Sequence, residues 1–367
     1  MNKTERIKAA FSFAPTDRIP RYEIFLPEFK ESFRAFYGLP SADGVYSFYH
    51  KVDIGAVLTD QRGPLYGQCA TESDDGDAHV VRDSWGRRLY LRRSAYFEKV
   101  LDVALGDKGD LDGLPFGDPA PAELKTSYRA MADGIQDRFA PVSGVLGLFM
   151  GSYRMRGESD YLEDLVADEP FCAALADRLA GFVGDYGIAA AEATGAKETA
   201  MWIYDEFAST KGPLFSPRTF ERIFHPVYKK MITKWRASGI KNVVLHCDGN
   251  CGPFLDMLID AGFNGLQGIA PSTGLWLPDL KKRYGRSLTL IGGMCNIHTL
   301  THGTHQEIRK QAEALVEAAR DGGVILGTHS IDADVPVENY NLYDSILDEY
   351  DRLWPGKEWH TGCFSQN

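Results

Sequence analysis

Two histidines and an aspartate are the residues of this sequence best suited to chemistry. His246 and Asp248 lie two positions apart in the run HCDGN, and His329 follows the apolar run VILG and a threonine. Two imidazoles and a carboxylate can bind zinc or iron(II), or can serve as acid, base and orienting group in proton transfer. The same side chains could instead hydrogen-bond a polar substrate directly. We therefore predict His246, Asp248 and His329 as catalytic residues and candidate metal ligands.

Other polar side chains follow short apolar runs in the same way. Asp205 and Glu206 come directly after TAMWIY, Asn250 closes HCDGN, Gln267 lies near the end of the run 263–269, and Cys295 lies two positions after LIGG. We predict a catalytic role for Asp205. The substrate-binding residues are predicted to be the other four, Glu206, Asn250, Gln267 and Cys295.

Several of these candidates also have a structural alternative. Either histidine could be a satisfied polar residue that caps a neighbouring helix. Asp205 could be an N-cap or an ion-pair partner of Lys211 or Arg218, and Cys295 could belong to the core. Cys247 alternates with His246 and Asp248, so on a strand its side chain points to the opposite face, and we expect it in the core. The histidines of the loop before a later helix are expected to be solvated; these are His298, His302 and His305.

The elements that must position these residues alternate between strands and helices. The apolar runs predict strands at 142–149, 199–204, 242–246, 263–269, 288–293 and 324–327. Amphipathic stretches predict helices at 161–193 with a break near 168–170, and at 216–238, 252–261, 277–284, 306–320 and 337–353. Such alternation favours parallel strands joined by crossover helices.

We predict an α/β fold, a (β/α)8 TIM-type barrel with N-terminal additions. In such barrels the chemistry lies where strands end and loops toward helices begin, which is where the polar candidates occur. A doubly wound open sheet is the competing architecture. No G-x-G-x-x-G follows an early strand, so its dinucleotide-binding version has less support.

The N-terminal part is less regular than the rest. We predict a helix at 3–11, a buried strand at 53–59, a hairpin or excursion at 78–90 around Gly86, and a surface loop at 106–121. No low-complexity linker interrupts the sequence. We therefore expect one domain spanning residues 1–367.

Composition restricts the function class. The chain has 367 residues, 44% of them hydrophobic, and a formal net charge of −11, which argues against nucleic acid or an anionic membrane as the main partner. No run approaches the roughly 18 apolar residues of a membrane span, and the N-terminus has no apolar signal core. The six cysteines are scattered and are expected to be reduced thiols. We expect a cytoplasmic enzyme.

The chain resembles the uroporphyrinogen decarboxylase superfamily, which includes the methyltransferases that move methyl groups to and from corrinoid proteins. The similarity lies in segments that occur in the family's order: PTDRIP at 15–20, DEFASTKGPLFSP at 205–217, VLHCDGN at 244–250, KRYGRSLTLIGG at 282–293, and GGVILGTHSIDADVPVEN at 322–339. It covers nearly the whole chain. The resemblance implies a barrel independently of the periodicity.

Two departures from the family patterns indicate the branch. The Arg-rich loop with which true uroporphyrinogen decarboxylases hold their substrate is replaced by RYEIFLPE, in which Glu23 and Glu28 would repel a polycarboxylate. The thiol-methylating members hold zinc with H-x-C and a later Cys, whereas here Asp248 and His329 stand in the cysteine places. The resemblance therefore implies a non-sulfur site, with zinc as a candidate metal.

The sequence leaves three functions open. The first is a methyltransferase acting between a corrinoid protein and a small-molecule methyl donor or acceptor, with tetrahydrofolate or a methyl ether or amine favoured over a thiol. No D-x-H-x-x-G occurs, so the corrinoid would be supplied by a separate protein. The second is a cofactor-free decarboxylase of a small aromatic or porphyrin-like acid. The third is a binding protein that lost catalysis. Barrels of this family are often dimers, so a homodimer is a further option.

Overall fold

The computed structural model describes residues 1–93 and 98–354. The chain divides into two compact units. Unit 1 comprises Met1–Ala56, Ile135–Ala140 and the chain from Gly265 onward, and unit 2 comprises Val57–Gly134 and Pro141–Asn264. The single domain expected from the sequence remains a prediction, and each unit is described by itself below.

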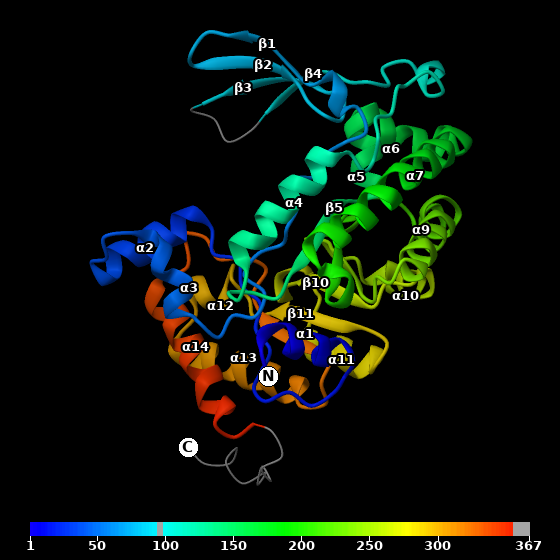
Figure 1. Cartoon of the computed structure of the whole chain (residues 1–367). Coiled ribbons are helices and arrows are strands. Elements are labelled where there is room, and N and C mark those ends of the chain that lie inside the picture. Colours follow the sequence, from blue (N-terminus) through cyan, green and yellow to red (C-terminus); the bar gives the residue numbers. More distant parts are fainter. Residues whose placement is uncertain (94–97, 355–367) are drawn as a thin grey trace. The chain divides into compact units, whose positions relative to one another are not determined.

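The parallel strands lie in two groups of three, β12-β11-β10 in unit 1 and β9-β6-β5 in unit 2; Figure 1 labels β10 and β11 of the first group and β5 of the second. Unit 2 contributes β5 (Val142–Leu146), β6 (Ala200–Tyr204) and β9 (Val243–His246), which pair in parallel. Unit 1 contributes β10 (Gly265–Ile269), β11 (Thr289–Gly293) and β12 (Val324–Gly327), also parallel. Nearly every residue of these strands is buried, as expected for a parallel sheet covered on both faces.

Two short segments add strand positions beyond these six. Arg21 bridges in parallel to Leu326 of β12, and the neighbouring Tyr22 bridges to Ile54. In unit 2, Leu58 bridges to Ser143 of β5. The segments around 21–22 and 54–58 thus supply the two remaining positions, and the fold is the predicted (β/α)8 barrel.

The strand predicted at 53–59 is only partly formed. It pairs through the single bridges at Ile54 and Leu58 rather than as a continuous strand. Between them, the carbonyl oxygen of Gly55 accepts a hydrogen bond from the Tyr46 hydroxyl at 2.9 Å, which takes it out of the sheet ladder. The apolar sequence correctly indicated that this segment is buried. It could not show that a tyrosine hydroxyl bonds the Gly55 carbonyl in place of a neighbouring strand.

Helices follow the strands, and most lie where the periodicity predicts them. Those at Lys3–Phe11 and Leu277–Tyr284 have the predicted bounds. The α-helices are α1 (Lys3–Phe11), α2 (Pro27–Tyr37), α3 (Val45–Phe48), α4 (Ala122–Ile135), α5 (Leu148–Arg156), α6 (Glu158–Ala167), α7 (Glu169–Thr194), α8 (Pro217–Thr219), α9 (His225–Ala237), α10 (Leu255–Ala261), α11 (Leu277–Tyr284), α12 (Thr299–His302), α13 (His305–Ala319) and α14 (Val337–Asp351).

Predicted and observed boundaries differ by a few residues at several elements, and two of the differences have a local cause. The strand predicted at 142–149 ends at Leu146, because α5 begins at Leu148. The helix predicted at 216–238 is capped by Ser216 as expected, with its hydroxyl accepting from the Thr219 N–H at 3.0 Å. It is not continuous, since a π-helical turn at Phe220–Phe224 separates α8 from α9.

An antiparallel sheet of four strands, β1 (Ala70–Asp74), β2 (Ala78–Arg82), β3 (Arg88–Arg92) and β4 (Lys99–Asp102), is inserted in unit 2 before β5. Its central hairpin, β2 with β3, is the one predicted around Gly86, which has a φ of 78°. The sheet is anchored by Trp85, whose indole N–H donates to the Gln61 carbonyl at 3.0 Å. The edge strands β1 and β4 were not predicted, because all their residues are exposed and show no alternation of buried and exposed positions.

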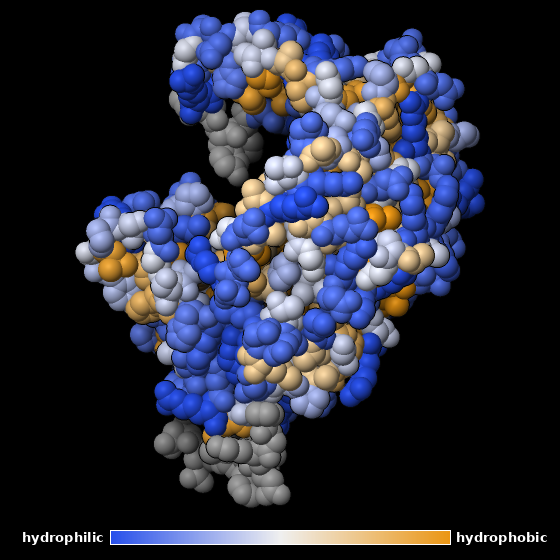
Figure 2. All heavy atoms as spheres, viewed as in Figure 1, coloured by the Kyte–Doolittle hydropathy of each residue, from blue (hydrophilic) through white to orange (hydrophobic). Residues whose placement is uncertain are grey.

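The surface agrees with the acidic, polar composition. Figure 2 shows a face on which hydrophilic residues predominate and apolar residues are scattered. Among residues 1–93 and 98–354, no helix combines the length and the apolar character needed to cross a membrane.

Candidate functional site

The carboxyl ends of β6 and β9 lie side by side in unit 2. Tyr204 at the end of β6 is in register with His246 at the end of β9. The ladder continues one step further, since the Asp205 N–H donates to the His246 carbonyl at 3.0 Å. Because both strands end at the same level, the polar residues that follow each of them are neighbours.

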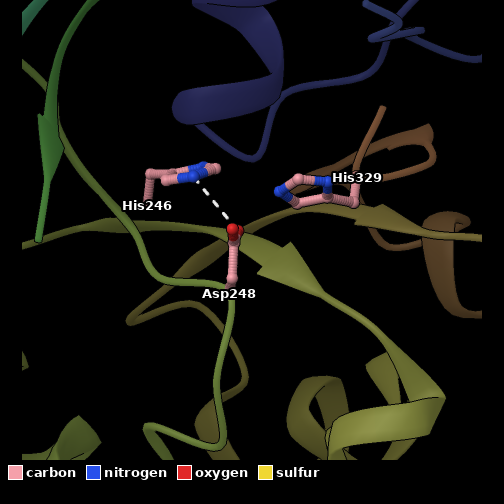
Figure 3. Close-up of side chains that lie close together, drawn as sticks. All are labelled: His246, Asp248 and His329. Carbon is pink, nitrogen blue, oxygen red and sulfur yellow. Dashed lines mark ion pairs between the residues drawn. The ribbon is translucent and has the colours of Figure 1, made fainter. Parts of the chain in front are cut away.

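His246 faces two carboxylates. Its Nε2 lies 3.1 Å from Asp248 Oδ1 and 3.6 Å from Glu206 Oε1. The ring packs edgewise against Tyr204, with centroids 4.8 Å apart. The side chain of His246 is only 13% exposed, whereas that of Asp248 is 54% exposed. The ion pair drawn in Figure 3 is therefore partly open to a ligand on the Asp248 side.

Glu206 is bonded to the backbone of the same loop. Its Oε2 accepts a hydrogen bond from the Asp248 N–H at 2.7 Å. Burial raises the pKa of the Glu206 carboxyl, the neighbouring Cys247 and Asp248 raise it further, and His246 opposes them. A cation held among these groups would offset the cost of a buried negative charge.

Asp205 is turned into the protein. Its carboxylate accepts hydrogen bonds from the N–H groups of Phe149 at 3.0 Å and Met150 at 2.7 Å, and from the Tyr228 hydroxyl. These are N–H groups of the first turn of α5, so Asp205 caps a helix rather than pairing with Lys211 or Arg218. Burial raises the pKa of Asp205 to about 7. Its catalytic role stays a prediction.

A glycine makes this arrangement possible. A side chain at Gly147, the residue between β5 and α5, would place its Cβ 2.3 Å from Asp205 Cγ. Only glycine lets the Asp205 carboxylate approach the start of α5 so closely. The absence of a side chain at Gly147 thus lets Asp205 reach the first turn of α5.

Asn250 and Cys247 complete the loop after β9. The Asn250 side-chain oxygen accepts from the Gly252 N–H at 3.1 Å, at the start of a short 3-10 turn. Cys247 is fully buried, as expected from its alternation with its neighbours. A hydrogen bond to the Cys251 thiol, together with burial, raises the pKa of the Cys247 thiol. Cys247 thus belongs to the core.

In unit 1, His329 is held close to the end of β12. Its carbonyl oxygen accepts hydrogen bonds from Gln267 Nε2 at 3.2 Å and from the Tyr22 hydroxyl at 3.3 Å. Its Nδ1 lies 3.1 Å from the Ser330 hydroxyl. Gln267 lies on β10 and is fully buried. Its hydrogen bond to the His329 carbonyl therefore helps to fix the backbone of His329.

Cys295 and the loop histidines occupy the neighbouring turn. Cys295 is 3% exposed, and its sulfur accepts from the His298 N–H at 3.4 Å. Its predicted substrate contact stays a prediction. His298, His302 and His305 are exposed at the ends of α12 and the start of α13, in agreement with the solvated state expected for them.

Glu23 is a buried polar residue that was not predicted as part of the site. It is fully buried, with Thr328 Oγ1 donating to it at 2.6 Å and the Tyr340 hydroxyl at 3.2 Å. Burial raises the pKa of Glu23 to about 8. It follows the bridging residue Tyr22, so applying the strand-end rule to this first strand position would have identified it. Of the two glutamates expected to repel a polycarboxylate, only Glu28 is exposed.

His246, Asp248 and His329 are the residues predicted as metal ligands, and Figure 3 labels all three. Within unit 2, His246 Nε2 lies 3.1 Å from Asp248 Oδ1, whereas His329 belongs to unit 1. The set comprises two imidazole nitrogens and one carboxylate oxygen. Such donors fit Zn²⁺ in catalytic sites, where three protein ligands leave a position for water or substrate.

The family model for uroporphyrinogen decarboxylase (URO-D) matches residues 118–350. The chain belongs to the URO-D family. The matched region runs from α4 to α14 and contains the predicted catalytic and substrate-binding residues. Glu23 and the inserted sheet β1–β4 lie outside it, so they are features that the URO-D match does not cover.

A solved structure shares the fold of this URO-D chain. A "methyltransferase from Methanosarcina mazei" matches with a TM-score of 0.66 at 19% identity, over 95% of this chain and 99% of that one. At that identity the similarity shows the fold. A "Putative Vitamin-B12 Independent Methionine Synthase from Listeria monocytogenes" matches with a TM-score of 0.46 at 12% identity, over 94% of this chain and 99% of that one. Comparison with curated proteins gave no match.

Proposed function

We propose that this URO-D family protein is a methyltransferase that moves a methyl group between a corrinoid protein and a small molecule. The observation that carries the proposal is the pair of His246 and Asp248 at the end of β9, with Nε2 and Oδ1 3.1 Å apart. His329 is the third proposed ligand. These residues stand where thiol-methylating relatives are expected to have a His and two Cys ligands. The Methanosarcina mazei protein that shares the fold is described as a methyltransferase.

The nature of the donors favours a particular substrate class. Two cysteine thiolates would make a metal site that favours a soft sulfur nucleophile, whereas nitrogen and oxygen ligands leave a harder Lewis acid. We therefore favour tetrahydrofolate, or a methyl ether or amine, over a thiol. When bound, the metal would supply Lewis acidity at the heteroatom that gains or loses the methyl group.

The chain's own residues have supporting parts in this proposal. His246 and Asp248 bind the metal from the end of β9, and Tyr204 restricts the His246 ring by edgewise packing at 4.8 Å. Gln267 and Tyr22 fix the backbone of His329. The corrinoid would be carried by a separate protein that docks where the strands end.

A methyl-transfer assay tests the function. The protein is mixed with methylcobalamin at comparable concentration, and the visible absorbance is followed after adding tetrahydrofolate, a phenol, an amine or a thiol. The expected result is loss of the methylcobalamin spectrum with a non-thiol acceptor. Absence of any change with all four acceptor classes would overturn the proposal.

A second candidate is a cofactor-free decarboxylase of a small aromatic or porphyrin-like acid. Asp205 favours it, because a carboxyl with a pKa of about 7 suits proton transfer at neutral pH. Its three hydrogen bonds to α5 and Tyr228 count against it, since they occupy the carboxylate within the protein. Release of carbon dioxide from such acids, lost in Asp205→Asn, would favour this function.

A further inference from the structure

The loop that follows β9 is held by a neighbouring segment of unit 2. The Asn250 N–H donates to the Ser209 carbonyl at 2.9 Å. A Cβ at Gly249 would lie 2.0 Å from the Ala208 carbonyl oxygen, so the two segments touch backbone to backbone there. The loop therefore has little freedom on the Asn250 side of Asp248.

On the β9 side of Asp248, a hydrogen bond from a side chain takes the place of the backbone hydrogen bonds that pair the two strand ends. The last ladder bond between the strand ends is Asp205 N–H to the His246 carbonyl, at 3.0 Å. One residue after Asp205 and two residues after His246, the Asp248 N–H donates to Glu206 Oε2 at 2.7 Å. The side-chain oxygen of Glu206 thus fixes the peptide group of Asp248 itself.

The second carboxylate oxygen of Glu206 faces His246, which forms the ion pair with Asp248. Oε1 lies 3.6 Å from His246 Nε2, which in turn lies 3.1 Å from Asp248 Oδ1. The Glu206 side chain is 26% exposed and that of Asp248 is 54% exposed. Asp248 is thus the carboxylate open to solvent, and Glu206 lies behind it.

We propose that Glu206 is a positioning residue, whose carboxylate holds the Asp248 peptide and so aims the Asp248 carboxylate at His246. This changes the substrate-binding role predicted for Glu206 from the sequence. The inference rests on the proposed function in assigning a metal to the site. The positioning itself concerns the loop alone and is testable without a metal. Groups that orient metal ligands from behind commonly affect affinity 10–100-fold on mutation.

Two substitutions separate the reach of Glu206 from its charge. Glu206→Gln keeps the side-chain length and an oxygen that can accept the Asp248 N–H, but it removes the charge. Glu206→Asp keeps the charge but withdraws the carboxylate by one methylene. A positioning role predicts that the Gln variant resembles the wild type and that the Asp variant is impaired. A direct ligand or charge role predicts the reverse.

The first measurement is hydrogen exchange of the Asp248 amide in full-length, chelator-treated protein. We expect exchange about 10-fold or more faster in Glu206→Asp, and close to wild type in Glu206→Gln. Glu163→Ala removes an exposed glutamate of α6 in the same unit, and it should leave this amide unchanged. Equal protection in the wild type and Glu206→Asp would overturn the proposal, as would equal loss in both Glu206 variants.

The second measurement is zinc affinity by competition with a chromogenic chelator. We expect a fall of about 10–100-fold in Glu206→Asp, and a change of at most a few-fold in Glu206→Gln. Loss of affinity in Glu206→Gln with retention in Glu206→Asp would overturn the positioning role. If the wild type binds no zinc, the metal part of the proposed function fails, and the exchange experiment alone decides the role of Glu206.

Discussion

The ends of β6 and β9 are neighbours in one sheet, yet they use their acidic residues in opposite ways. After β6, Asp205 is fully buried and accepts hydrogen bonds from α5 and Tyr228. After β9, Asp248 is 54% exposed and lies 3.1 Å from His246 Nε2. The same residue type at neighbouring strand ends is thus bonded within the protein in one case and lies exposed beside an imidazole in the other. Position at a strand end indicates where chemistry can occur, but the partners of each side chain decide its role.

The largest effect is expected from removing the imidazole after β9. His246→Ala should lower methyl transfer by more than about 100-fold, because losing a metal ligand costs more than losing a group that supports one. The measurement is the initial rate of methylcobalamin demethylation, with circular dichroism to show that the variant is folded. A folded variant with an unchanged rate would contradict the proposal that the residues after β9 take part in the chemistry.

The aspartate after β6 should affect stability more than the site. Asp205→Ala leaves the N–H groups of Phe149 and Met150 and the Tyr228 hydroxyl without their acceptor in a buried place. We expect a loss of about 3 kcal/mol in the free energy of unfolding, measured in urea, with zinc affinity of the folded protein unchanged. A variant of wild-type stability that cannot bind zinc would show that Asp205 supports the metal site and not the fold.

The pH dependence of stability should carry the signature of Asp205. Burial raises its pKa from the usual value near 4 to about 7, so the folded state holds this proton more tightly than the unfolded state. The contribution of the neutral acid is fully present below about pH 4 and is lost as pH rises through 7, by up to about 4 kcal/mol. Asp205→Asn cannot ionise and should lack this decline. Parallel stability curves for the two proteins between pH 4 and 8 would contradict the buried state of Asp205.

The smallest effect is expected at the residue type most often associated with zinc. Cys247 is fully buried between His246 and Asp248. Cys247→Ala should cost about 1 kcal/mol of stability through lost packing and leave zinc stoichiometry unchanged. Loss of zinc from this variant, with its fold intact, would show that a thiol takes part in the site.

The sequence predicted the architecture well, because the barrel strands and helices have strong local signals. The strand Val324–Gly327 is an uninterrupted apolar run, and α1 has a capping box between Asn2 and Glu5. Boundaries failed where the signal is ambiguous. Leu148 and Phe149 are apolar and extend the pattern of β5, although they open α5. The edge strands β1 and β4 depend on pairing with distant residues, which local composition does not reveal.

For the site, the sequence predicted where the residues lie along the chain but not the directions in which their side chains point. It put Asp205, Glu206 and Asp248 at strand ends, and the structure places them there. The inward turn of Asp205 depends on Gly147, a residue 58 positions earlier in the chain, whose missing side chain makes room for the carboxylate. The bond from Asp248 to Glu206 depends likewise on the pairing of β6 with β9. Such contacts between distant residues have no signature in local patterns.

Elemental analysis of protein purified without chelator is the most direct test of the proposed metal site. We expect about one zinc or other divalent transition metal per chain in the wild type and in Cys247→Ala, and loss of the metal from both His246→Ala and His329→Ala. Full metal content in both histidine variants, with loss in Cys247→Ala, would contradict the assignment of a His246, Asp248 and His329 site.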